Sequence, residues 1–120
     1  MFLLTIKDKF DSAHQLKNYK GKCSQVHGHT WKIEMTVEGY AQDEVGICAD
    51  FKKLKDALKI VTDSLDHTFL NKKIKKPTAE NIALYIYDKV NLRGLPVILR
   101  RIAVWETDNS CVVYEPIVGK

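Results

Sequence analysis

The sequence has 120 residues, of which 45% are hydrophobic and 28% charged, a composition typical of one soluble globular domain spanning residues 1–120. No apolar run approaches the roughly 18 residues that cross a bilayer, and the first residues lack the features of a signal peptide, so we expect a cytoplasmic protein without a membrane partner. The net charge of +4 is mild, and no aromatic residue is interleaved with the densest lysine cluster, which argues against a nucleic-acid partner.

The first predicted element is a β-strand over residues 2–14, in which apolar side chains recur at every second position. Asp8 interrupts the apolar face, so we expect a bulge or a bend there. The same face ends in His14. Residues 15–26 are polar and contain several turn-forming residues, which indicates a connecting loop.

The second predicted strand alternates strictly from His27 to Glu38, and its apolar face begins with His27 and His29. If the two strands form a hairpin, these side chains and His14 meet at one end of the sheet. They are either three separate core histidines or one metal site. Three converging imidazoles without an obvious fourth protein ligand are typical of catalytic zinc, so we expect a metal site there.

Cys23 lies in the loop just before this strand, four residues from His27. It is a fourth metal ligand, a thiolate that moves protons, or an inert thiol, and the spacing alone leaves all three open. The other two cysteines, Cys48 and Cys111, have no such neighbours, and we expect both to be packing residues. The odd count without CxxC spacing excludes a disulfide framework.

Two helices are predicted next. Asp50 caps the first, and its apolar stripe consists of Phe51, Leu54, Leu58, Val61 and Leu65. It ends near Asp66 and His67, which form either a polar helix terminus or, with Cys23, an acid–base relay. After a lysine cluster (Lys72, Lys73, Lys75 and Lys76), Thr78 caps the second helix, and Glu80 lies in its first turn.

The chain returns to strand at residues 97–107, and a turn at 108–110 joins a last strand at 111–117. The order ββααββ predicts an α+β fold with an antiparallel four-stranded sheet. Glu106 ends a strand face that also carries Ile98, Ile102 and Val104. Its carboxylate is either solvated or able to accept two hydrogen bonds from the amidine-like edge of a heterocycle.

Six blocks in this order resemble one known family along essentially the whole chain. They are Phe10-Asp-Ser-Ala-His14, Cys23-x-x-x-His27-Gly-His29, Asp50-Phe51-x-x-Leu54-Lys55, Leu65-Asp66-His67-x-x-Leu70-Asn71, Pro77-Thr-Ala-Glu80-Asn81 and Trp105-Glu106-Thr107. The chain resembles the 6-pyruvoyl-tetrahydropterin synthase / 6-carboxytetrahydropterin synthase family. The resemblance implies a tunnelling fold (T-fold), with two helices on one face of the sheet and an oligomeric barrel built as a trimer or a dimer of trimers.

The resemblance also implies roles for individual residues. It implies that His14, His27 and His29 bind Zn²⁺, and that Cys23 abstracts a proton in a relay with Asp66 and His67. It further implies that Glu106 anchors the pterin edge and can join the relay, and that Thr78 and Glu80 line the substrate pocket.

The short spacing between Cys23 and His27 resembles that of the bacterial and archaeal 6-carboxy-5,6,7,8-tetrahydropterin synthases of queuosine biosynthesis. The implied activity is that of a zinc-dependent lyase, which converts 7,8-dihydroneopterin triphosphate to 6-carboxytetrahydropterin, triphosphate and acetaldehyde. The lysine cluster is expected to steer the triphosphate. The alternatives are a 6-pyruvoyl-tetrahydropterin synthase of the biopterin type and a non-catalytic zinc- or pterin-binding module.

Overall fold

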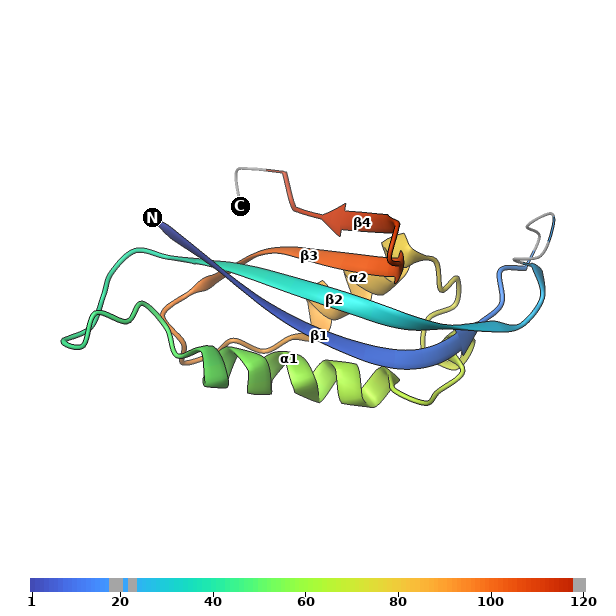
Figure 1. Ribbon diagram of the computed structural model, residues 1–120, viewed down its shortest axis with the longest axis horizontal. Helices are drawn as coiled ribbons and strands as arrows, with labels where there is room; N and C mark the ends of the chain where they lie inside the picture. The colour runs from blue at the N-terminus through green and yellow to red at the C-terminus, as the bar shows by residue number, and fades with distance from the viewer. Residues whose placement is uncertain (18–20, 22–23, 118–120) are drawn as a thin grey trace.

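A computed structural model describes residues 1–17, 21 and 24–117 of the chain (Figure 1). Its elements are β1 (Phe2–His14), β2 (His27–Gly39), α1 (Phe51–Leu65), the 3₁₀ turn η2 (Leu70–Lys72), α2 (Ala79–Lys89), β3 (Ile98–Thr107) and β4 (Ser110–Tyr114). The predicted order ββααββ is confirmed. Within the described residues, no helix is both long and apolar enough to cross a membrane.

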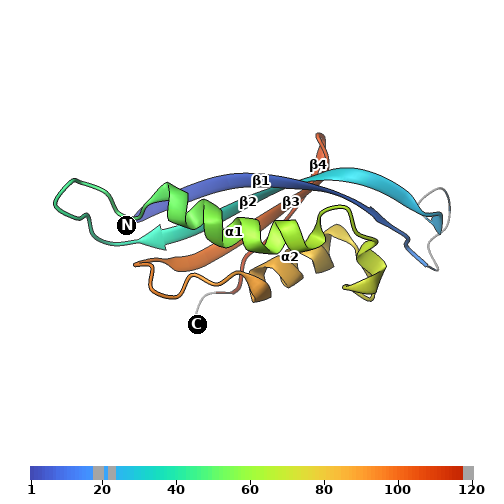
Figure 2. The same ribbon diagram turned by 90° about the horizontal axis from the view of Figure 1, so that it is seen from below.

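The four strands form one antiparallel sheet in the order β1-β2-β3-β4, so β1 and β4 are its edges. Both helices cover the same face of this sheet (Figure 2), with α1 against β1 and α2 against β3 and β4. The apolar core lies between the helices and the sheet, and includes fully buried Trp31 and Leu58. The predicted α+β fold is confirmed.

The β1–β2 hairpin pairs without interruption from Phe2 opposite Gly39 to His14 opposite His27. No register shift occurs at Asp8, so the expected bulge is wrong. The Thr62 hydroxyl of α1 donates a hydrogen bond to the Asp8 carboxylate at 2.6 Å. Because this donor gives the carboxylate a hydrogen bond, the regular strand tolerates Asp8 on its inner face.

Two register shifts interrupt β3 instead. Arg100 has no partner on β2, and Glu106 has none on β4. The extra residue at Arg100 inverts the alternation on its N-terminal side, so Ile98 is 58% exposed while Leu99 packs against the core. The prediction that Ile98 shares the buried face of Ile102 is therefore wrong.

Both predicted helix caps are confirmed. The Asp50 carboxylate accepts the Lys52 N–H at 2.8 Å, and the Thr78 hydroxyl oxygen accepts the Asn81 N–H at 3.2 Å. The predicted stripe of α1 is buried except at Phe51, which is 57% exposed. Phe51 is the first residue of α1.

Candidate functional site

Three histidines meet at the loop end of the β1–β2 hairpin, where the strands lead into the connecting segment. His14 and His27 are direct cross-strand partners, and His29 follows two residues later on the same face of β2. One nitrogen from each ring lies within 4.8 Å of the others. The strand alternation that buries Trp31 and Ile33 thus also turns the histidines inward, and the predicted convergence is observed.

The hydrogen bonds of two rings fix where their protons lie. His14 Nδ1 is 2.7 Å from the Pro77 carbonyl oxygen, and His27 Nδ1 is 2.8 Å from that of Gln25. Because a carbonyl only accepts, each Nδ1 carries the hydrogen and each Nε2 of the neutral ring presents a lone pair. These two Nε2 atoms are 2.9 Å apart, so their lone pairs repel unless a cation or a proton lies at the cluster.

The third ring has an unsatisfied nitrogen. His29 Nε2 is buried and has no hydrogen-bond partner among the described residues. Burial lowers the pKa of His14 and of His29 below the ordinary 6.5, and the Pro77 hydrogen bond and the Glu106 charge offset this only in part. Neutral imidazoles with free lone pairs are what a divalent metal requires, so this donor set fits one.

Glu106 reaches the histidines because it is the extra residue of the second β3 bulge. Its carboxylate oxygen lies 3.8 Å from His14 Nε2 and 4.0 Å from His29 Nε2, and its side chain is 32% exposed. Bulges often re-aim one side chain beside a functional site. The carboxylate therefore has free acceptor positions next to the three histidines.

A hollow of about 370 Å³ opens beside Glu106, and Thr78 and Glu80 at the start of α2 also line it. The structure thus brings together the three residues predicted to contact substrate. The exposed Cys111 lines it too, so the expectation of a packing role for this residue is wrong. Burial and the Glu34 charge raise the pKa of the Cys111 thiol, which therefore stays protonated at neutral pH.

Asp66 and His67 lie at the end of α1, against β1. The Asp66 carboxylate accepts the Asp11 N–H at 2.8 Å and the His67 Nδ1–H at 2.9 Å, and these two bonds lower its pKa. The His67 ring is 79% exposed, and its Nε2 is left with a lone pair for a proton. Neither residue belongs to the histidine cluster, and Cys23 lies outside the described residues.

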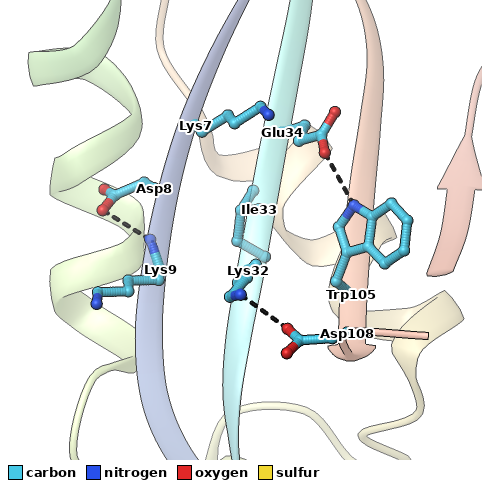
Figure 3. A pocket seen from close by; sticks show the side chains of 8 residues that line it. All are labelled: Lys7, Asp8, Lys9, Lys32, Ile33, Glu34, Trp105 and Asp108. Carbon is cyan, nitrogen blue, oxygen red and sulfur yellow. Dashed lines mark hydrogen bonds and ion pairs between the residues drawn. The ribbon is translucent and has the colours of Figure 1, made fainter. Parts of the chain in front are cut away.

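A different hollow, of about 530 Å³, lies on the sheet face opposite the helices (Figure 3). Its polar groups are largely paired with one another: Lys32 with Asp108 at 2.7 Å, and the Trp105 indole N–H with Glu34 at 3.0 Å. Its eight lining residues include neither histidine nor cysteine. We therefore assign the candidate chemistry to the histidine end, although the hollow there is smaller.

Comparisons with known proteins agree with this geometry. A family model described as 6-pyruvoyl tetrahydropterin synthase matches residues 3–116. A dihydroneopterin monophosphate aldolase of Pyrococcus furiosus is 41% identical over 88% of this chain and 90% of its own length. A 6-carboxy-5,6,7,8-tetrahydropterin synthase of Synechocystis is 34% identical over 95% and 93%. The 6-pyruvoyl tetrahydropterin synthase structure of Caenorhabditis elegans superposes with a TM-score of 0.82 at 26% identity and covers 98% of both chains.

Proposed function

Because the chain belongs to the 6-pyruvoyl tetrahydropterin synthase family, we propose that it is a 6-carboxy-5,6,7,8-tetrahydropterin synthase of queuosine biosynthesis. Its substrate would be 7,8-dihydroneopterin triphosphate, and its products 6-carboxytetrahydropterin, triphosphate and acetaldehyde. The observation that carries the proposal is the group of three imidazoles whose nitrogens converge beside a hollow that contains Glu106. The three-residue spacing between Cys23 and His27 favours this product within the family.

We infer that the metal is Zn²⁺ and that His14, His27 and His29 hold it. Bound there, zinc would polarise the hydroxyl groups of the substrate side chain and acidify the neighbouring C–H. Imidazole also accepts other divalent ions, so metal analysis of the purified protein decides its identity.

We propose the other roles from the family resemblance, and the positions of Glu106, Thr78 and Glu80 around one hollow support theirs. Glu106, with free carboxylate oxygens, would accept hydrogen bonds from the 2-amino and N3 edge of the pterin, while Thr78 and Glu80 shape the same hollow. We propose Cys23 as the residue that removes the proton, with His67 as its partner and Asp66 holding the His67 ring. Glu106 is a further candidate member of this relay.

We also propose that the protein is a homo-oligomer, a trimer or a dimer of trimers. Among the described residues, the 13-residue strand β1 has a strand partner on one side only, and on its other side only Asp11 and Ala13 form backbone hydrogen bonds, to His67 and Thr68. Long unpaired edges of this kind are normally covered. In an assembly, exposed His67 can face the site of a neighbouring copy. The cytoplasmic location and the single domain over residues 1–120 stay predictions.

The 41% identical Pyrococcus relative favours a second candidate, an aldolase acting on dihydroneopterin monophosphate. A retro-aldol cleavage of that compound leaves a hydroxymethyl group on the pterin and releases a phosphorylated two-carbon aldehyde. The same zinc and proton-moving groups suit both reactions, so the products must decide. The 6-pyruvoyl product, in which triphosphate leaves without cleavage of the side chain, is the third outcome.

The deciding experiment supplies zinc-loaded enzyme with 7,8-dihydroneopterin triphosphate or monophosphate and identifies all products by mass spectrometry, with aldehydes trapped as hydrazones. Trapped acetaldehyde together with 6-carboxytetrahydropterin supports the proposal. The phosphorylated aldehyde would indicate the aldolase, and 6-pyruvoyltetrahydropterin the biopterin-type enzyme. Failure to turn over either substrate would favour a non-catalytic binding module.

Replacing Cys23 tests its proposed role as the base. We expect Cys23→Ala to lower kcat by roughly 100-fold or more while the bound zinc stays at the wild-type level. Cys48→Ala is the matched control, because Cys48 lies in a separate hollow near Pro96. Loss of zinc from Cys23→Ala would instead make Cys23 a metal ligand, and unchanged turnover would exclude it as the base.

A further inference from the structure

We propose that a second hollow beside the histidines binds the phosphate chain of the substrate, through Lys75 and Lys76 with Lys17 at its rim. This hollow has a volume of about 470 Å³, and all three lysines line it. The inference rests on the proposed function, because it assigns the phosphate end of the same substrate.

The charge of this hollow is of one sign. Three of its eight lining residues are lysines, and none is an aspartate or a glutamate. Among the described residues, Lys17, Lys75 and Lys76 take part in no ion pair within 4 Å. Three lysines that line one concave surface without counter-charges favour the binding of an anion of high charge. A triphosphate group has that charge, whereas an uncharged pterin ring does not.

The position of this hollow matches the order of groups in the substrate. Thr78 and Leu16 line both this hollow and the one that contains Glu106, so the two adjoin. The Pro77 carbonyl between the lysines and Thr78 holds the His14 ring. A pterin against Glu106 would therefore place its hydroxylated side chain at the histidines and its phosphates at the lysines. Ring, hydroxyls and phosphates follow in the same order in dihydroneopterin triphosphate.

The wall of the hollow is held in place by a reciprocal pair of hydrogen bonds. The Asn71 side chain accepts the Gln15 N–H at 2.9 Å and donates to the Gln15 carbonyl oxygen at 2.8 Å. This pair fixes the η2 turn against the end of β1, which carries His14. The lysine-bearing segment is thus positioned relative to the histidines, as a subsite for one end of a substrate requires.

The four lysines of the cluster at residues 72–76 differ in their position relative to this hollow. Lys75 and Lys76 line the hollow, whereas Lys72 and Lys73 do not. The two pairs carry equal charge and lie within five residues of each other. Substitutions of the two pairs can therefore be compared directly. If the lysines only attract the substrate through their general positive field, both pairs should matter equally, whereas direct binding in the hollow should depend on Lys75 and Lys76 alone.

The test measures binding of inorganic triphosphate to the zinc-loaded protein by calorimetry, and KM for dihydroneopterin triphosphate. We expect Lys75→Gln/Lys76→Gln to weaken triphosphate binding about tenfold and to raise KM similarly, with kcat within about twofold. The control Lys72→Gln/Lys73→Gln should change either quantity by less than about twofold. Binding of dihydroneopterin, which has no phosphate, should be the same in both variants.

Equal weakening by both pairs would overturn the proposal, because it would indicate a general electrostatic field. No effect from Lys75→Gln/Lys76→Gln would also overturn it. If triphosphate binding depends on Lys75 and Lys76 while the protein turns over neither pterin phosphate, the anion subsite is supported and the proposed function fails. If turnover is as proposed but triphosphate binding ignores these lysines, the function stands and the subsite fails.

Discussion

At the scale of single residues, the site is defined by which imidazole nitrogens are occupied. The Pro77 and Gln25 carbonyls take the Nδ1 hydrogens of His14 and His27, which leaves Nε2 for a metal. The orphaned Nε2 of His29 completes the set. A carbonyl that orients a ligating histidine in this way also raises the basicity of the free nitrogen.

This assignment predicts that the cluster histidines and His67 behave differently. We expect His29→Ala to weaken zinc binding by more than about 100-fold, since a direct ligand should matter more than an outer partner, and to abolish turnover. We expect His67→Asn to keep its zinc and to lower kcat by roughly 100-fold or more. Metal content by plasma mass spectrometry and initial rates on the same preparations measure both effects.

Asparagine is the suitable replacement because His67 has a φ of 54°. Asparagine tolerates this left-handed conformation better than alanine does, so the variant isolates the loss of the imidazole from backbone strain. Zinc loss in His67→Asn would show that His67 supports the metal centre, and full turnover would remove it from the relay.

At the scale of elements, the regular segments were predictable from the sequence. The period of two defined β1 and most of β2, and the caps Asp50 and Thr78 defined the helix starts. The convergence of the histidines followed, because an uninterrupted hairpin always places the end of β1 beside the start of β2. The six sequence blocks then indicated the family, which the hydrophobic periodicity alone could not identify.

The bulges in β3 were not predictable. Arg100 and Glu106 each add one residue to a ladder whose alternation otherwise looks regular, and a bulge depends on the partner strand as much as on its own sequence. Asp8 shows the converse case, since its hydrogen bond to Thr62 comes from a residue 54 positions away. Long-range partners of this kind also explain why the hollow containing Cys111 was missed.

Thr78 belongs both to an element and to the site, because its hydroxyl caps α2 and the residue lines the two hollows. We expect Thr78→Ala to lower the free energy of unfolding by about 1 kcal/mol and also to raise KM. Asp50→Ala is the matched control. It removes the cap of α1, far along the chain from the histidines, and should cost a similar free energy without changing KM. Chemical denaturation and steady-state rates measure the two effects.

The conservative variant Thr78→Ser retains the capping oxygen, and we expect it to restore most of the stability. A rise in KM of equal size in Asp50→Ala would attribute the effect to helix stability alone. An unchanged KM in Thr78→Ala would remove Thr78 from the substrate site.

At the scale of the whole molecule, the residues proposed to act together do not all lie together within one chain. The histidines and Glu106 lie together, whereas His67 is exposed at the end of α1 and outside the cluster. The chain is also elongated, with extents of 54 × 29 × 24 Å. Among the described residues, neither β4 nor the part of β1 before Asp11 has a strand partner on its outer side. Closing the sheet against further copies would cover those edges and bring new side chains to each site.

We therefore expect light scattering to give a mass three or six times the 13.8 kDa of one chain. Val113 of edge strand β4 is 52% exposed, and lysine at this position should oppose pairing across the edge. We expect Val113→Lys to shift the protein toward the monomer and to lose turnover in proportion, while its zinc content stays unchanged.

Ile60→Lys is the matched control, because Ile60 is 74% exposed on α1 and does not belong to an edge strand. It introduces the same charge in place of an exposed apolar side chain, so it should leave mass and turnover unchanged. A fully active monomeric Val113→Lys would show that one chain contains a complete site, and the relay would then have to form within it. A monomeric wild-type protein would contradict the proposed assembly directly, whatever the activity of the variants.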